Sequence, residues 1–430
     1  MSAPLPTDID VAVIGGGPAG STAATLLARQ GWRVSLIERD RHPRFHIGES
    51  LLPLNLPILE RLGVLAEVAA MGVHKPAADF LGESGAHNRF RFDRALRVVA
   101  DHAFQVRRDQ FDDLLFRTAA SAGADAREST EVVAVHREAD QHWTVALKRA
   151  DETVSLRCRY LIDCSGRDTL LARQWKLKRA HPRHRSAALY GHFRGVERRP
   201  GDDAGNISIY RLPQGWMWMI PLPDDVMSVG AVCTPDYLKQ RRGALDTFLR
   251  ETVCTHPEAA RRMQRAEAAA PAEATGNYSY QSREIAGPGW VMAGDAYAFV
   301  DPIFSSGVFL AMHSAEQAAQ LVDRVLRAPA EESTLQRAYR RRMDAGLKTF
   351  SWFIERFTTP TMRHLFERPR NVWQIEQAVI SMLSGDVFDN PAVHSRLRAF
   401  RMIYRITAVG LRWQRWRGRG APAATLESTA

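Results

Sequence analysis

The order of apolar and polar residues near the start of the chain predicts a strand, a helix and a second strand. Residues 10–14 (DVAVI) form a short β-branched run typical of a buried parallel strand, and residues 33–37 (RVSLI) form another. Residues 21–30 between them have a helix-forming composition. This order is that of a βαβ unit, which binds ligands at the carboxyl ends of its parallel strands.

Glycines join the first strand to the helix in the pattern Gly15-x-Gly17-x-x-Gly20, and Glu38 ends the second strand. Such glycines permit a tight turn and let the backbone approach a pyrophosphate at the positive end of a helix, while the acid can bind ribose hydroxyls. The alternative is a glycine-rich turn without a ligand, but five parts at the correct separation favour a dinucleotide site. Its predicted contacts are Gly15, Gly17, Ala19, Gly20, Glu38 and Arg39.

A segment far along the chain indicates which dinucleotide is bound. Residues 289–296 predict a strand that runs into Gly294-Asp295, and such an aspartate can hold the ribityl hydroxyls of a flavin. The loop at residues 299–307 leads into a predicted helix at 308–326, whose N-terminal amides favour an anion or an electron-rich ring. This arrangement favours FAD.

Two further pieces complete the predicted cofactor domain. Residues 160–167 form another strand and turn, and Arg108 precedes a predicted helix at 111–115. Together the pieces resemble the FAD-binding half of the flavoprotein monooxygenase superfamily. No second Gly-x-Gly-x-x-Gly lies between a strand and a helix, so no separate NAD(P)H domain is expected.

Short alternating runs in residues 171–274 predict an antiparallel sheet laid over the flavin. His192 and Tyr210 fall in these runs, and we expect core or rim positions for both. After about residue 331 the chain becomes helical and basic. Residues 396–419 contain eight arginines and no acid, with apolar residues at helical spacing at positions 399, 402, 403, 406, 409 and 413.

Four motifs resemble those of flavin-dependent halogenases of the phenol or pyrrole type. Residues 45–53 (FHIGESLLP) resemble the strap that covers the flavin in that family, and residues 215–221 (GWMWMIP) fill every fixed position of its WxWxIP signature. Residues 301–307 (DPIFSSG) resemble its flavin- and halide-binding loop, and Lys75 falls where the family carries its catalytic lysine. The resemblance spans residue 8 to about residue 390.

This resemblance implies a two-component enzyme that uses FAD, reduced by a separate flavin reductase, and a halide ion. In the family, hypohalous acid formed at the flavin crosses a tunnel to the lysine and then to an electron-rich aromatic carbon. The implied roles are catalysis for Lys75, cofactor binding for Gly48, Glu49, Ser50, Arg108, Asp295, Pro302, Gly307 and Val308, halide binding for Ser306 and Gly307, and a tunnel wall for Trp216, Trp218, Ile220 and Pro221. No metal is implied.

Each implied role has a plainer alternative. A lysine near a helix end is ordinarily a solvated surface charge, whereas enclosure would lower the pKa of Lys75. The tryptophans can simply fill a core. Ser305 and Ser306 can simply cap the following helix. The lysine can act through a haloamine or through a hydrogen bond, and the sequence does not decide between them.

One departure from the family concerns the substrate. Tryptophan-specific halogenases place a glutamate where this chain has Phe304, and that acid assists attack on an unactivated ring. Its absence favours a ring that activates itself, a phenol or a pyrrole, over free tryptophan. The nearby acids Asp79 and Glu83 are not assigned as bases.

We therefore predict an α/β protein with a Rossmann-like FAD-binding domain, an antiparallel-sheet substrate domain and a helical C-terminal region. The FAD-binding domain is assigned to residues 1–55, 100–170 and 275–325, the substrate-binding region to 56–99 and 171–274, and the helical region to 326–430. Residues 418–430 are expected to form a loose tail.

The net charge of the chain indicates which kind of partner it can bind. Lys plus Arg exceed Asp plus Glu by ten, so part of the surface should attract anions. For the basic segment at 396–419 we favour an acidic acyl carrier protein that holds the aromatic substrate, while a membrane surface is not expected and no segment resembles a nucleic-acid recognition module. The equally weighted alternative is that this helix docks its apolar residues on the main domain.

Cysteine spacing and apolar content limit the remaining possibilities. The four cysteines lack the spacing of a zinc site or a disulfide framework, which fits a reducing cytoplasm. No apolar run reaches the length of a membrane span, and we expect a cytoplasmic location. The rival functions are a flavoprotein hydroxylase, a geranylgeranyl-reductase-like enzyme and a flavin-binding accessory protein without turnover.

Overall fold

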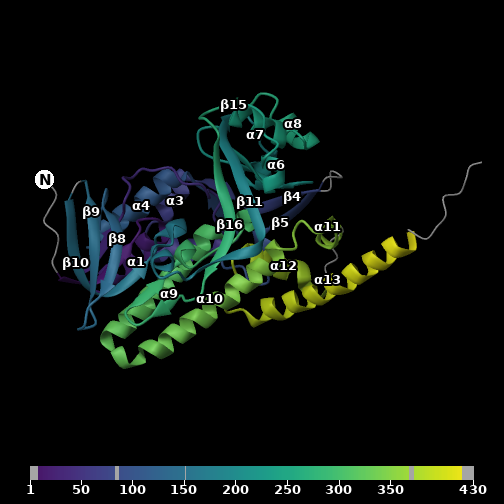
Figure 1. Ribbon diagram of the computed structural model, residues 1–430. Coiled ribbons are helices and arrows are strands. Elements are labelled where there is room, and N and C mark those ends of the chain that lie inside the picture. The colour runs from purple at the N-terminus through teal and green to yellow at the C-terminus, as the bar shows by residue number, and fades with distance from the viewer. Residues whose placement is uncertain (1–7, 83–86, 151, 368–371, 419–430) are drawn as a thin grey trace, which may run out of the picture.

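The computed structural model describes residues 8–82, 87–150, 152–367 and 372–418 (Figure 1). Its first sheet has a parallel centre, in which β1 pairs with β2, as the N-terminal pattern predicts, and with β10 on its other side. The strands, in spatial order, are β17 (Ala286–Gly287), β18 (Trp290–Met292), β10 (Glu152–Asp163), β1 (Asp8–Ile14), β2 (Val34–Ile37) and β7 (Asp125–Arg127), with β8 (Glu131–Arg137) and β9 (Trp143–Arg149) paired beyond β10.

Among the helices that share an apolar core with this sheet, three begin at the candidate site. They are α1 (Pro18–Arg29), α4 (Arg108–Ser121) and α9 (Gly307–Arg327). The central strands β1 and β2 are buried at every position except Asp8, because helices and neighbouring segments cover both faces of the sheet.

The second sheet has nine strands and carries the WxWxIP segment. In spatial order it contains β19 (Ala298–Phe299), β16 (Glu273–Ser282), β11 (Lys178–Arg194), β14 (Val226–Cys233), β13 (Gly215–Pro221), β12 (Ile207–Leu212), β4 (Ala77–Leu81) and β5 (His87–Arg91), with β15 (Glu267–Ala268) paired to β11. The pairs are antiparallel, as predicted, except that β12 runs parallel to β4. The predicted α/β class with this second sheet is confirmed.

Alternation along β13 divides its side chains between two cores. Trp216, Trp218 and Ile220 join the core toward the C-terminal helices, whereas Met217 and Met219 join a smaller core on the opposite face. The smaller core is completed by α6 (Pro235–Leu238), α7 (Leu245–Val253) and α8 (Pro257–Arg262). Tyr210 lies in this second core, as expected, and its hydroxyl receives a hydrogen bond from Arg262.

After β2 the chain forms several short elements, and one of them carries Lys75. They are α2 (Leu56–Leu62), α3 (Leu65–Met71) and a two-stranded sheet of β3 (Val73–Lys75) and β6 (Ala103–Gln105). The short helix α5 (Leu170–Gln174) follows β10. Glu83 lies outside the described residues.

The C-terminal region is helical, as predicted (Figure 1). It consists of α10 (Glu332–Ile354), which packs beside α9, then α11 (Pro360–Glu367), α12 (Ile375–Leu383) and α13 (Pro391–Gly418). None of the helices in the described ranges has the length and apolarity needed to cross a membrane. Apart from Gly418, the expected loose tail lies outside the described residues.

The apolar residues predicted to form one face of α13 divide in the structure. Ala399 and Ile403 pack against the large core, but Met402, Ile406 and Val409 are exposed. The helix docks through another set of residues, which includes Val393, Leu397 and Phe400. The expectation that the named apolar residues as a group dock on the main domain is therefore wrong.

Candidate functional site

The turn after β1 requires glycine at two positions. Gly15 has φ +99°, and a Cβ there would lie 2.4 Å from the carbonyl oxygen of Cys164. A Cβ on Gly20 would lie 1.8 Å from the carbonyl oxygen of Gly15, so the helix can approach the turn only without a side chain.

The N-terminus of α1 is open where the turn meets the helix. Gly17 precedes the first turn, which has no side-chain cap, and a Cβ on Gly17 would approach only the end of Arg44, at 3.7 Å. Backbone N–H groups at such an end bind phosphate oxygens. This arrangement fits the pyrophosphate of a dinucleotide.

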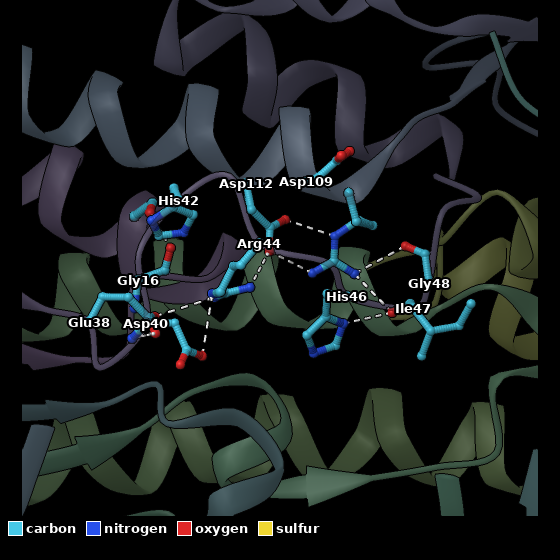
Figure 2. Close-up of polar contacts among 12 residues, drawn as sticks. Gly16, Glu38, Asp40, His42, Arg44, His46, Ile47, Gly48, Asp109 and Asp112 are labelled. Carbon is cyan, nitrogen blue, oxygen red and sulfur yellow. Dashed lines mark hydrogen bonds and ion pairs between the residues drawn. The ribbon is translucent and has the colours of Figure 1, made fainter. Parts of the chain in front are cut away.

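Glu38 supports the same turn from the end of β2. Its buried carboxylate accepts hydrogen bonds from the Gly16 amide (2.7 Å) and from Arg44 (3.3 Å), as Figure 2 shows. The neighbouring Arg39 is half-exposed and forms an ion pair with Asp168. The carboxylate of Glu38 therefore holds the glycine turn. Its predicted contact with a ribose stays a prediction.

Arg108, the first residue of α4, connects the turn to the strap. It forms two hydrogen bonds with Asp112 (2.8 and 3.0 Å) and donates to the carbonyls of Ile47 (3.2 Å) and Gly48 (3.1 Å). Burial by itself would raise the pKa of Asp112, but the Arg108 and Arg44 guanidinium groups hold that pKa below its usual value. Figure 2 shows Asp112 between Arg44 on one side and the strap residues Ile47 and Gly48 on the other.

The next strap residue, Glu49, reaches the second sheet. One of its carboxylate oxygens lies 2.7 Å from Nε2 of His192 on β11, and the other is buried without a hydrogen-bond partner among the described residues. The sequence predicted a core or rim position for His192 and left it out of the site, and its contact with Glu49 joins residues 143 positions apart. The available signal was weak: His192 is a titratable residue within an otherwise apolar run of β11.

Lys75 ends β3 with only 1% of its surface exposed. Its Nζ donates to Oγ of Ser50 (2.8 Å) and to the carbonyl of Leu51 (2.8 Å), and it lies 5.4 Å from the centre of the Phe92 ring. Burial lowers the pKa of this amine to about 7. The surface-charge alternative for Lys75 is therefore wrong, while its catalytic role stays a prediction.

Gly294 and Asp295 follow β18, close to the start of α9. Gly294 has φ +60° and donates its amide hydrogen to Ser314 (2.8 Å). Burial raises the pKa of Asp295 to about 6, against the lowering influence of Arg167 and Arg108. A carboxylate in this place suits hydrogen bonds from hydroxyl groups of a ligand.

The loop before α9 is held by the WxWxIP segment. Trp216 donates from Nε1 to Oδ1 of Asp301 (3.0 Å), and Asp301 also accepts from the Ile303 amide (3.3 Å). Pro302 opens the short turn Pro302–Phe304, and Ser305 adopts φ +55°. The indole ring therefore ties β13 to the loop that precedes the helix.

The N-terminus of α9 has open space beside buried polar groups. The hydroxyl of Ser306 is fully buried and has no hydrogen-bond partner within the described ranges, and a Cβ on Gly307 would meet nothing within 4 Å. Ser306 is the N-cap residue, but its side chain does not cap, so the capping alternative is wrong for this residue. Amides at the start of a 21-residue helix favour an anion here. The adjacent Val308 is buried.

The tryptophans of β13 are packed as core residues, as their alternation predicts. Trp216 and Trp218 lie with ring centres 5.7 Å apart, and Trp218 donates to Ser228 (3.2 Å). Ile220 lies on the same face, and Pro221 ends the strand. Whether these residues also separate flavin from substrate stays a prediction.

Asp79 is engaged away from the Lys75 amine. Its buried carboxylate lies 3.2 Å from Nε2 of His87 and receives a hydrogen bond from Asn206 (3.3 Å). The same Asn206 accepts the Ala77 amide (3.0 Å), which fixes the backbone just after Lys75. Asp79 thus supports the backbone near Lys75 through Asn206.

A pocket of about 650 Å³ opens between β11, β16 and α10, and it includes Phe299, Val300 and Asp301. A second pocket, of about 430 Å³, is lined by Arg167 and Tyr280 among others. Both pockets reach the segment beside Asp295 or the loop before α9, and neither is lined by Lys75.

Comparison with known proteins identifies this arrangement. Residues 8–352 match the family described as FAD binding domain. The chain is 36% identical over 396 residues to a tryptophan 2-halogenase from Chondromyces crocatus, which covers 90% of this chain and 75% of that protein. The chain belongs to the flavin-dependent halogenases. It is therefore an oxidoreductase with FAD as cofactor and halide as substrate.

Two further halogenases resemble the chain over most of its length. A 1H-pyrrole-2-carbonyl-[peptidyl-carrier protein] chlorinase from Pseudomonas fluorescens is 29% identical over 406 residues, or 89% of this chain and 90% of that protein. The structure of the flavin-dependent brominase Bmp2 matches with a TM-score of 0.82 and 28% identity, covering 93% of this chain and 100% of that one. The predicted halogenase family is confirmed.

Proposed function

We propose that this halogenase forms hypohalous acid at the N-terminus of α9 and uses Lys75 to guide it to a phenolic or pyrrolic ring. The observation that carries the proposal is the state of the Lys75 amine, which is buried, has a pKa of about 7 and is bound to the strap through Ser50. A surface amine would be almost wholly protonated at neutral pH, whereas this one is partly neutral.

Cofactor binding follows the groups that line the first sheet. The turn at Gly15, Gly17 and Gly20 binds the pyrophosphate, with Ala19 packed behind it, and Glu38 and Arg39 lie toward the adenosine. The residues toward the flavin are Gly48, Glu49, Ser50, Arg108, Asp295, Pro302, Gly307 and Val308. Bound reduced FAD and O₂ supply the two-electron oxidant, and a separate flavin reductase provides the reduced flavin. The three-part domain division given by the sequence is part of this proposal.

Halide binds beside Ser306 and Gly307. The support is the unpartnered, buried hydroxyl of Ser306 together with the open space at Gly307. Trp216, Trp218, Ile220 and Pro221 form the wall that keeps the substrate from the cofactor. Since Trp216 is hydrogen-bonded to Asp301, the wall and the halide loop act as one unit.

Lys75 acts on hypohalous acid in one of two ways. The neutral amine can attack the halogen, which forms an N–X bond, breaks the O–X bond and releases water after proton transfer. The ammonium can instead donate a hydrogen bond to the oxygen and polarise the O–X bond. In both cases the halogen passes to a ring carbon, which then loses its proton.

The substrate class follows from Phe304, which is an apolar residue in the loop. Because no acid lies at this position to assist, a phenol or pyrrole that stabilises the developing ring cation itself is favoured. The pyrrole-carbonyl carrier-protein relative supports a pyrrole presented on a carrier. The tryptophan 2-halogenase relative favours a second candidate, tryptophan, despite the missing acid.

The test combines purified enzyme, FAD, a flavin reductase, NADH, O₂ and bromide with phenols, free and carrier-tethered pyrroles, and tryptophan. Lys75→Ala should keep flavin oxidation but lose at least 99% of the halogenated product, as measured by mass spectrometry, because nothing else delivers the halogen (about 100-fold or more, the range of a lost catalytic group). Lys148→Ala, an exposed lysine on β9, is the matched control.

Three results would contradict this proposal. Unchanged product from Lys75→Ala would remove the lysine from its role. Hydroxylated products in place of halogenated ones would favour the hydroxylase alternative. No turnover of any substrate would favour an accessory protein.

A further inference from the structure

The helix α13 has two apolar faces, of which only one is covered. The inner face places Val393, Leu397 and Phe400 in the large core. The outer face presents Met402, Ile406 and Val409, which are 52%, 65% and 66% exposed. These three residues follow at intervals of four and three positions, so they lie along one stripe of the helix. Trp413, which is 51% exposed, continues the stripe by four more positions.

A row of arginines runs along one side of this stripe. Arg398, Arg405 and Arg412 are exposed and lie seven positions apart, a spacing that keeps them on one side of the helix. None of the three forms an ion pair with a carboxylate among the described residues. From residue 391 to residue 419 the sequence contains no acid. We call the three arginines and the stripe Met402–Ile406–Val409 the α13 docking face.

A series of aromatic contacts leads from the inner face of α13 to the loop before α9. On the inner face, Phe400 stacks on Phe353 of α10 with ring centres 5.3 Å apart. Four positions further along the chain, just after α10 ends, Phe357 lies with its ring centre 5.7 Å from that of Phe304 in the loop before α9 and 5.6 Å from that of Phe80. The docking face therefore lies on the outer side of an aromatic cluster that extends to the loop before α9.

The shape and charge of the α13 docking face indicate which kind of partner it can bind. An exposed apolar stripe marks an interaction site, and arginine suits carboxylates through paired hydrogen bonds. The arginines lie on one side only, and the side opposite the stripe is covered by the protein body. A matching surface is thus a helix with its own apolar stripe and one acidic edge, whereas an interfacial membrane helix has its basic face opposite the apolar one.

We propose that the α13 docking face binds the acidic helix of a carrier protein that presents the aromatic substrate as a thioester. This inference rests on the proposed function and deepens it by assigning the partner's binding surface. It assigns binding of the carrier to the outside of α13 and leaves the chemistry to Lys75. Loss of the face should therefore impair delivery of a tethered substrate and leave a free one unaffected.

The experiment compares two forms of one substrate, pyrrole-2-carboxylate on an acidic peptidyl carrier protein and the same acid as a small soluble thioester. Ile406→Ser and Arg405→Glu should each lower kcat/KM for the tethered form by about tenfold, the loss that follows about 1.4 kcal/mol of binding. The kcat/KM for the small thioester should stay within twofold. Arg149→Glu, a charge reversal on exposed β9, should change neither.

Binding is also measured without turnover, by calorimetry of the full-length enzyme with the loaded carrier at low and high salt. Weaker binding of both variants, with unchanged circular dichroism and Tm, supports the docking face. Unchanged binding, or an equal loss of activity on both substrate forms, overturns it.

A third arm tests a membrane partner with vesicles that contain phosphatidylglycerol. Vesicle binding that both variants abolish, together with unchanged carrier binding, assigns the face to an anionic membrane and overturns the proposal. The proposed function fails separately, when neither substrate form is halogenated although the carrier still binds.

Discussion

At the residue scale, the enclosed amine of Lys75 has a thermodynamic cost that its function would explain. In the unfolded chain a lysine has a pKa near 10.5, whereas burial lowers the pKa of Lys75 to about 7. Between these two values the unfolded chain binds more protons than the folded protein, so folding stability rises with pH through this window. Below about pH 7 this group adds its full destabilisation.

Replacing the amine with an apolar side chain should therefore stabilise the protein at neutral pH. Lys75→Met should raise the free energy of unfolding by a few kcal/mol at pH 7, since each pKa unit corresponds to about 1.4 kcal/mol. Denaturant unfolding at pH 7 and pH 10 measures the effect, and the gain should shrink at the higher pH. An equal gain at both pH values would contradict the burial argument.

Ser50 should tune the same amine. Its hydroxyl accepts a hydrogen bond from Nζ and so favours the charged form, which means that Ser50→Ala should lower the pKa of Lys75 further, by roughly one unit. If the neutral amine reacts, the acid limb of the pH profile for halogenated product should move to lower pH.

The conservative variant separates chemistry from structure. Ser50→Thr keeps the hydroxyl and should retain the original pH profile. A profile that moves equally in both variants would point to a packing effect in the strap.

Single residues also show what sequence reasoning could reach. The turn at Gly15 and Gly20 was predictable because a strand, a helix and an acid surround it within thirty residues. The contact between Glu49 and His192 was not, because only folding brings residues 143 positions apart together. The burial of Lys75 had to await the structure, since its immediate sequence gives no apolar pattern around the amine.

At the element scale, β13 and the loop before α9 are joined by the hydrogen bond from Trp216 to Asp301. Trp216→Phe keeps an aromatic ring but removes the donor, so the loop that carries Ser306 should lose its anchor. The KM for bromide should rise by about three- to tenfold, as expected for a lost hydrogen bond of about 1 kcal/mol. Steady-state product formation against bromide concentration measures this.

Trp218→Phe is the matched control, because Trp218 donates to Ser228 within the sheet. It should leave the KM for bromide unchanged. An equal rise in both variants would indicate a general loss of packing in β13 and would contradict the anchoring role.

The periodicity of the sequence predicted individual strands and helices better than it predicted which of them pair or pack together. The strands of the first sheet and the helix after residue 307 follow local patterns. The parallel pairing of β12 with β4 joins segments about 130 residues apart and has no local signal. In α13 the pattern located apolar residues correctly, but it could not tell which of them would face the body, since two apolar faces share one helix.

At the scale of the whole molecule, the two sheets carry different parts of the candidate site. The first carries the glycine turn, the second carries the tryptophan strand, and α13 extends beyond the other labelled elements in Figure 1. The overall class was predictable because its motifs are local and specific. The way in which three consecutive strap residues reach three different parts of the molecule was not.

The contacts of the strap would link flavin exchange to the position of the Lys75 amine. Gly48 is held by Arg108, Glu49 by His192, and Ser50 by Lys75, so one tripeptide connects α4, β11 and β3. An enzyme molecule whose strap has lifted to exchange its flavin would also have released the amine from its hydroxyl partner. With the role proposed for Lys75, only an enzyme whose strap is in place over its flavin would hold the amine in position to receive the halogen.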